Sequence, residues 1–145
     1  MQEPTKTIET EAKGLSAVVV GSDKIFMGFS SSMMSPNAQI QVYSHDYEQL
    51  QMIELDQVQD SIVSAMVLCH NEKYLVCSHR AGLITIINTE DFSFTTGSFL
   101  EQHGQIDHIQ GVTKILNEFV VLFETLVFST SSGLFVANLT PEGQL

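Results

Sequence analysis

The residues best suited to chemistry in this sequence are its five histidines. His103 and His108 lie on either side of Asp107, and imidazole and carboxylate groups are both zinc ligands. A separation of five positions within a loop does not fix the geometry of a metal site, and no cysteine lies nearby. We therefore predict no metal ion and no other cofactor.

The other candidates for catalysis also lack the partners that their chemistry needs. His70 and Glu72 form the His-x-Glu pattern of zinc deaminases, but the sequence has no Pro-Cys-x-x-Cys segment to complete it. The same residues fall in a predicted turn. His79 ends a β-rich run and is expected to form a structural hydrogen bond to a neighbouring strand. The serines Ser129, Ser131 and Ser132 lie in no Gly-x-Ser-x-Gly elbow. We predict that the protein is not an enzyme and has no catalytic residue.

The charge of the chain restricts its partners. Seventeen acidic residues against six basic ones give a formal net charge of −11. Nucleic acid and anionic membrane surfaces are therefore poor partners, and a basic protein is a better one. Acidity also serves solubility alone, so this interpretation stays open.

Length, composition and cysteine count indicate one soluble domain. A chain of 145 residues with 43% hydrophobic residues can bury a core of its own. No apolar run approaches the roughly 18 residues of a membrane span, and residues 1–10 do not resemble a signal peptide. Cys69 and Cys77 are too few for a disulfide framework, and both are expected to be reduced core thiols. We expect a cytoplasmic or nuclear protein.

The elements that position these residues are predicted to be β-strands. Two β-rich runs, Lys73–Arg80 and Leu83–Asn88, are separated by Ala81-Gly82, which predicts a tight hairpin. The uninterrupted apolar stretches Tyr74–Cys77 and Ile84–Ile87 are typical of strands covered on both faces. On paired strands that turn near residue 71, Cys69 is expected to face Tyr74.

The rest of the chain repeats this pattern. The expected strands are 15–20, 24–30, 39–44 and 48–55, then 62–69, 73–80, 83–88 and 92–99, and finally 109–115, 119–123 and 134–139. Residues 125–132 fit either a loop or a bulged extension of the preceding strand. Asn71-Glu72 recurs as Asn117-Glu118 at an offset of 46, and Gly82-Leu83 recurs as Gly133-Leu134 at an offset of 51. A period in the forties with four short strands is typical of a propeller blade.

These units resemble WD40-type β-propeller repeats. Residues Gly82–Asn88 occupy the place where such repeats carry a glycine, an alternating third strand and a terminal Trp-Asp. The chain has no tryptophan, and Tyr43, Ile87 and Asn138 stand at its position. The resemblance implies an all-β, β-propeller-like domain of three four-stranded blades, about 15–56, 61–100 and 106–139. Residues 1–13 are expected to be a tail or a closing outer strand.

Three blades do not close a ring, because propellers usually have four to eight. We therefore expect a partial propeller that a second copy, a partner chain or further sequence completes. The implied function is a non-catalytic scaffold for protein–protein interaction. The loop residues expected to bind the partner are Met33, Met34, Gln57, Gln59, Asp60, Glu101, His103 and His108. Met33 and Met34 fit an interaction surface, but a position under their loop as apolar filler is slightly favoured.

A propeller that binds glycans or other small ligands is the alternative function. Such sites usually stack their ligand on Trp or Tyr rings. The absence of tryptophan and the presence of only three tyrosines weigh against this alternative.

Overall fold

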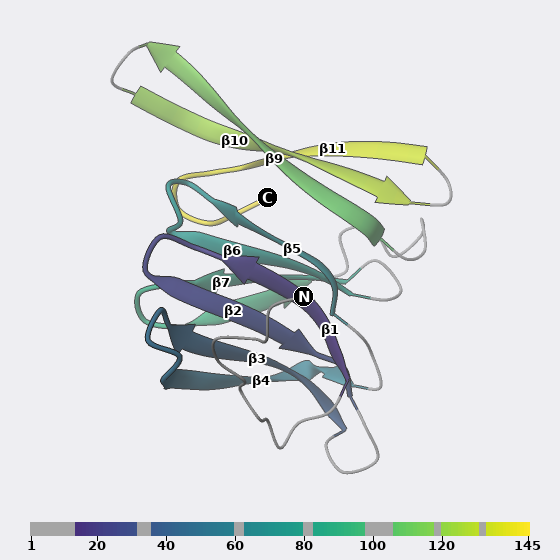
Figure 1. The fold of residues 1–145 in the computed structure, drawn as a ribbon. Coiled ribbons are helices and arrows are strands. Elements are labelled where there is room, and N and C mark those ends of the chain that lie inside the picture. Colours follow the sequence, from purple (N-terminus) through teal and green to yellow (C-terminus); the bar gives the residue numbers. More distant parts are fainter. Residues whose placement is uncertain are drawn as a thin grey trace, which may run out of the picture.

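The computed structural model describes residues 14–31, 36–59, 63–79, 83–97, 106–117, 120–130 and 133–145. These residues form strands without any helix, arranged in three antiparallel sheets (Figure 1). Each sheet is a meander in which consecutive strands are hydrogen-bonded neighbours. The prediction of an all-β protein is confirmed.

The first two sheets have four strands each, and the third has three. The first sheet consists of β1 (Leu15–Val20), β2 (Lys24–Phe29), β3 (Asn37–Ser44) and β4 (Gln49–Gln59). The second consists of β5 (Val63–Cys69), β6 (Tyr74–His79), β7 (Ile84–Asn88) and β8 (Phe94–Gly97). The third consists of β9 (Ile106–Asn117), β10 (Val120–Thr130) and β11 (Gly133–Leu139).

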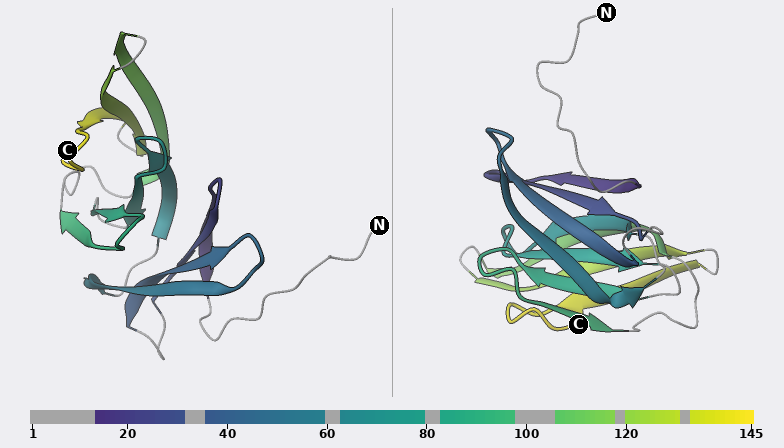
Figure 2. Two further views of the ribbon diagram at one scale, coloured as in Figure 1. Left: turned by 90° about the vertical axis from the view of Figure 1, so that its left-hand side faces the viewer. Right: turned by 90° about the horizontal axis from the view of Figure 1, so that it is seen from below.

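The sheets are stacked in chain order, with the second sheet between the other two (Figures 1 and 2). Most of the close backbone approach between sheets involves the first strand of each. β1 lies beside β5, and β5 lies beside β9. The second sheet is therefore called the middle sheet below.

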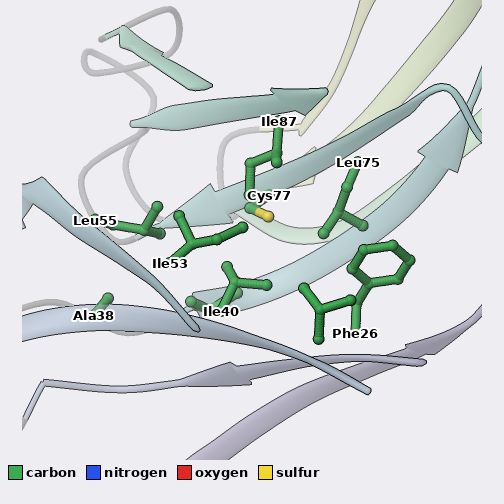
Figure 3. Close-up of a cluster of buried hydrophobic side chains, with 10 residues drawn as sticks. Phe26, Ala38, Ile40, Ile53, Leu55, Leu75, Cys77 and Ile87 are labelled. Atoms are coloured by element: carbon green, nitrogen blue, oxygen red, sulfur yellow. The ribbon is translucent and has the colours of Figure 1, made fainter. Parts of the chain in front are cut away.

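Apolar side chains fill the space between the first and middle sheets (Figure 3). The buried members are Phe26, Ala38, Ile40, Val42, Ile53 and Leu55 from the first sheet and Val63, Leu75, Cys77 and Ile87 from the middle sheet. Burying one large aliphatic or aromatic side chain of this kind stabilises the fold by about 1.5–3 kcal/mol.

A second cluster joins the middle sheet to the third. It contains Cys69, Tyr74, Val76 and Ile84 from the middle sheet and Leu126, Ala137 and Leu139 from the third. Every residue of β6 is buried, because alternate side chains of this strand enter the two clusters. This confirms the prediction that Tyr74–Cys77 is covered on both faces.

The turn between β5 and β6 sets the register of the middle sheet. His70, Asn71 and Glu72 all have positive φ angles of 50°, 54° and 67°. Three successive left-handed residues reverse the chain tightly, so that Cys69 pairs with Tyr74, as predicted.

The structure corrects two expected loops. Residues Gln57 and Gln59 belong to β4, and Gln59 pairs with Asn37, although the strand was expected to end at Leu55. His108 belongs to β9 and pairs with Ser129 of β10. The physical reason is that backbone hydrogen bonds extend a strand through polar residues wherever a partner strand is present.

Candidate partner-binding surface

One face of the first sheet is turned away from the middle sheet, and we call it the open face. The register of the sheet builds two rows across it. One row is formed by Val18, Met27, Gln41 and Met52, and the other by Val20, Ile25, Tyr43 and Gln49. None of these eight side chains carries a charge, whereas the next row on the same face ends in the exposed Glu54, which pairs with Gln39. The opposite face of the sheet holds Phe26, Ile40 and Ile53 in the core.

The apolar residues at the two edges of the open face are exposed to solvent. Val18 is 50% exposed, Val20 is 64% exposed and Met52 is 43% exposed. Leu15 and Leu50 are also exposed. Exposed apolar side chains gathered at the edges of one sheet face make this face a candidate interaction site.

The centre of the open face is polar but internally satisfied. The Tyr43 hydroxyl donates a hydrogen bond of 2.9 Å to Oε1 of Gln41, and both side chains are buried. Because these groups pair with each other, covering the open face costs little in lost hydrogen bonds to water.

The middle sheet differs from the first sheet in how its faces are covered. Its two faces are both covered, one by the first sheet and one by the third. The first sheet packs one face on the middle sheet, whereas its open face buries Gln41 and Tyr43 at the centre and exposes Val18, Val20 and Met52 at the edges. On the third sheet, Val136 is 64% exposed, whereas its neighbour Ala137 is buried against the middle sheet.

Polar contacts connect the middle sheet to both neighbouring sheets at the β5–β6 turn. The Glu72 carboxylate accepts a hydrogen bond of 2.7 Å from the backbone N–H of Ser22, and the Ser22 hydroxyl also donates to it. On the other side, Nε2 of His70 lies 2.6 Å from the backbone oxygen of Leu139 and donates to it. One turn of the middle sheet therefore holds both neighbours.

A buried hydrogen-bonded chain crosses the middle sheet at its other end. Nε2 of His79 lies 2.7 Å from the Thr85 hydroxyl, which lies 2.8 Å from the Thr96 hydroxyl. These contacts connect β6, β7 and β8. The prediction that His79 forms a structural hydrogen bond to a neighbouring strand is confirmed.

The described residues offer little further chemistry. Burial raises the pKa of the Cys77 thiol far above its usual range, so the thiol stays protonated and unreactive. No group of three or more His, Cys, Asp and Glu side chains in the described part of the chain is arranged to hold a metal ion. The same residues include no helix that is long and apolar enough to cross a membrane.

The residues predicted from loops do not gather into a site that can be described. Met33, Met34, Asp60, Glu101 and His103 lie outside the described residues. Gln57, Gln59 and His108 lie on strands of different sheets, β4 and β9. Their role in partner binding stays a prediction.

Sequence reasoning expected open blade faces on a partial propeller but did not name the residues of this face, although a signal was present. Alternate residues of a strand belong to opposite faces of its sheet. In β4, Leu50 and Met52 are apolar residues of one face, and Ile53 and Leu55 are apolar residues of the other. A strand with one face in solvent normally alternates apolar and polar residues. Apolar residues at both parities of an outer strand therefore indicate a second covered face.

No protein-family model matches the chain, and no curated protein matches it either.

Proposed function

We propose that this protein is a non-catalytic scaffold for protein–protein interaction, a WD40-like propeller module of three blades that a second copy or a partner chain completes. The observation that carries the proposal is the open face of the first sheet, with Val18, Val20 and Met52 exposed in uncharged rows. Association would bury this surface at about 25 cal/mol per Å² before the costs of binding.

The arrangement of the sheets supports the propeller interpretation. In a propeller, the first strand of every blade lines the central channel, and the later strands follow outward. Here β1, β5 and β9 lie side by side, and each sheet continues outward in chain order. Three blades form an open arc, so one face of the first blade and one face of the last are left for a partner.

The contacts within the chain indicate how a partner would bind. The middle sheet packs one face on the first sheet and its other face on the third, and in a propeller such contacts between blades are head-to-tail. A further sheet placed on the open face would repeat this contact, and repeated head-to-tail contacts form a ring when the rotation between units closes. Two copies would supply six blades, within the usual range of four to eight.

The glycan-binding alternative gains no support from the tyrosines. Tyr43 and Tyr74 are both buried. Tyr47 is exposed, but it lies alone at the turn between β3 and β4. A stacking platform needs an accessible ring face beside polar groups. The buried thiols of Cys69 and Cys77 suit a cytoplasmic or nuclear scaffold, which we include in the proposal.

The test uses two lysine substitutions at neighbouring positions of β4. Met52→Lys places a charge on the open face, whereas Gln51→Lys adds the same charge to an exposed neighbour of opposite parity. We expect Met52→Lys to weaken association by about tenfold or more, because a charge would be buried at the interface. Gln51→Lys should associate like the wild type. Sedimentation velocity over a range of concentrations measures the association of both variants, with or without an isolated partner.

Equal association of the two variants would contradict the proposal. Circular dichroism and thermal unfolding of each variant show whether it is folded. Met52 is already exposed at 43%, so its replacement is expected to leave the fold intact.

A further inference from the structure

β4 is the outermost strand of the first sheet (Figure 1). Within the described residues it is hydrogen-bonded to β3 alone, so its other edge presents backbone N–H and C=O groups to the outside of the sheet. β4 has 11 residues, whereas β8, the outermost strand of the middle sheet, has 4 in the described ranges. A rise of about 3.3 Å per residue makes the edge of β4 roughly 35 Å long. A long exposed edge of this kind is a template for pairing with another chain.

The middle of β4 is regular, whereas its two ends are irregular. The register with β3 shifts near each end of the strand. Between the two shifts, Gln51–Leu55 pairs residue by residue with Ala38–Val42. Bulges, lysine and proline commonly protect edge strands, and β4 contains neither lysine nor proline. The regular stretch Gln51–Leu55 is therefore open to a further strand, and we call it the acceptor segment.

The apolar core reaches the rim of the molecule beside the acceptor segment. Ile53 and Leu55 are buried in the cluster that joins the first and middle sheets. Phe92 and Phe94, from the β7–β8 turn and β8, pack against the same cluster but are only half-buried. A strand added next to β4 would direct alternate side chains toward the middle sheet. Apolar side chains at these positions would extend the cluster.

The opposite side of the acceptor segment carries negative charge at its end. Glu54 lies on the open face and is exposed, and Asp56 is exposed just beyond the segment. Neither carboxylate has an ion-pair partner among the described side chains, in which Lys24 pairs with Asp23. Opposite charges on facing residues of neighbouring strands stabilise their pairing, and like charges destabilise it. The net charge of −11 also favours a basic partner.

We propose that the edge of β4 along the acceptor segment binds an extended segment of another protein, which joins the first sheet as a fifth strand. The bound segment alternates apolar residues, which extend the core cluster, with basic residues, which lie next to Glu54 and Asp56. A second copy of β4 is a poor occupant, because it would bring acidic residues close to acidic residues. The site uses the edge of the first sheet, so it does not depend on association through the open face.

The experiment uses the whole chain and fluorescent peptides of defined sequence. The probe is the peptide Lys-Val-Lys-Val-Lys-Val-Lys, measured by fluorescence anisotropy in about 0.1 M salt, which screens charges more than about 10 Å apart. Two control peptides keep this sequence and charge but carry backbone N-methyl groups, one on its valines and the other on its inner lysines. In a strand, the N–H groups of alternate residues point to opposite edges. Only one of the two controls therefore loses the hydrogen bonds that join the peptide to β4.

The two N-methylated peptides separate strand pairing from attraction between charges. We expect saturable binding of the probe, one control that binds like the probe, and one control that binds at least about tenfold weaker. Equal binding of the two controls would overturn the site, because charge alone would then account for the binding. A probe that shows no saturable binding would overturn it as well.

Charge-reversed variants show where the peptide binds. The double variant Glu54→Lys with Asp56→Lys should weaken binding of the probe by about tenfold and should prefer a peptide in which glutamate replaces lysine. The matched control is Glu90→Lys with Glu142→Lys, two exposed positions outside the first sheet that change the net charge equally. This control should change binding of the probe by no more than about twofold. Equal loss of binding in the two double variants would contradict the proposed location.

Val20→Lys separates this site from the proposed association. Val20 lies on the open face but on β1, the strand at the other edge of the first sheet. The variant should weaken association and leave peptide binding unchanged. Unchanged association would overturn only the scaffold proposal, whereas loss of peptide binding would place the peptide on the open face and overturn the edge site. If a peptide of residues 4–13 of this chain displaces the probe and binds more tightly, the occupant is the chain itself and the assignment to another protein is wrong.

Discussion

Gly28 on β2 lies at a close approach between the first and middle sheets. A Cβ atom at this position would lie 2.9 Å from Cγ1 of Val63 on β5, closer than packed side chains allow. Gly28→Ala should therefore destabilise the protein by about 1–3 kcal/mol in urea unfolding. The double variant Gly28→Ala with Val63→Ala should lose less free energy of unfolding than the two single losses added together, because the smaller side chain at position 63 relieves the clash.

Gly97 provides the matched control for this prediction. A Cβ atom at Gly97 on β8 would meet nothing within 4 Å. Gly97→Ala is expected to change the free energy of unfolding by no more than about 0.5 kcal/mol. If the two alanine variants are equally stable, the first and middle sheets do not pack as described.

Cys77 makes the stability of the fold depend on alkaline pH. Burial raises the pKa of its thiol in the folded state, so only the unfolded chain releases this proton near the usual value of about 8.5. The contribution of the protonated Cys77 thiol to the free energy of unfolding is fully present below that pKa and is lost as the pH rises above it. The expected slope is up to about 1.4 kcal/mol per pH unit.

The measurement compares wild type and Cys77→Ala by urea unfolding between pH 7 and pH 10, roughly the window in which an unfolded thiol titrates. The wild type should lose stability more steeply with pH than the variant, although the variant is less stable at neutral pH because of its cavity. Parallel pH profiles would show that Cys77 is accessible to water in the folded protein.

At the scale of the elements, the β5–β6 turn acts as a clamp between sheets. Glu72 accepts two hydrogen bonds from Ser22 across the gap between the first and middle sheets. A double-mutant cycle with Ser22→Ala and Glu72→Ala should give a coupling energy of about 1 kcal/mol. Glu90→Ala, in the β7–β8 turn, should show no coupling to Ser22→Ala. A coupling energy near zero for both pairs would mean that the hydrogen bonds between Ser22 and Glu72 do not form in solution.

Most of the strands could be predicted, because the local pattern determines them. The turn at His70–Glu72 and the run Tyr74–Cys77 fix the middle hairpin, and its register follows from the turn alone. The ends of β4 and β9 were not predictable in this way. Their polar ends are held by partner strands, as in the pair Gln59 and Asn37, and backbone pairing leaves no trace in side-chain hydrophobicity.

The extension of β10 explains the early start of β9. Residues 125–130 continue the strand and pair with β11, which settles the choice between a loop and an extension. The same residues pair with the start of β9, so that Thr130 lies opposite Ile106. The links from Glu72 and His70 to the neighbouring sheets were also beyond sequence reasoning, because they join residues about 50 to 69 positions apart.

At the scale of the whole molecule, charge distinguishes association of two copies of the chain from association with a basic partner chain. Two copies would each carry −11 and repel each other, although their contact surface includes the uncharged rows of the open face. Salt screens this repulsion, so association of two copies should strengthen between roughly 0.05 and 0.5 M salt. Association with a basic partner should weaken over the same range. An affinity that does not change with salt would contradict both association of two copies and association with a basic partner.

The central claim is that the open face of the first sheet is completed by association. Light scattering behind size exclusion, over a dilution series of the wild-type chain, tests it most directly. We expect either a dimer that dissociates on dilution or a chain that stays soluble only with a co-purifying protein. A monomer that remains folded and monodisperse at every concentration, and that recovers no partner, would contradict the claim.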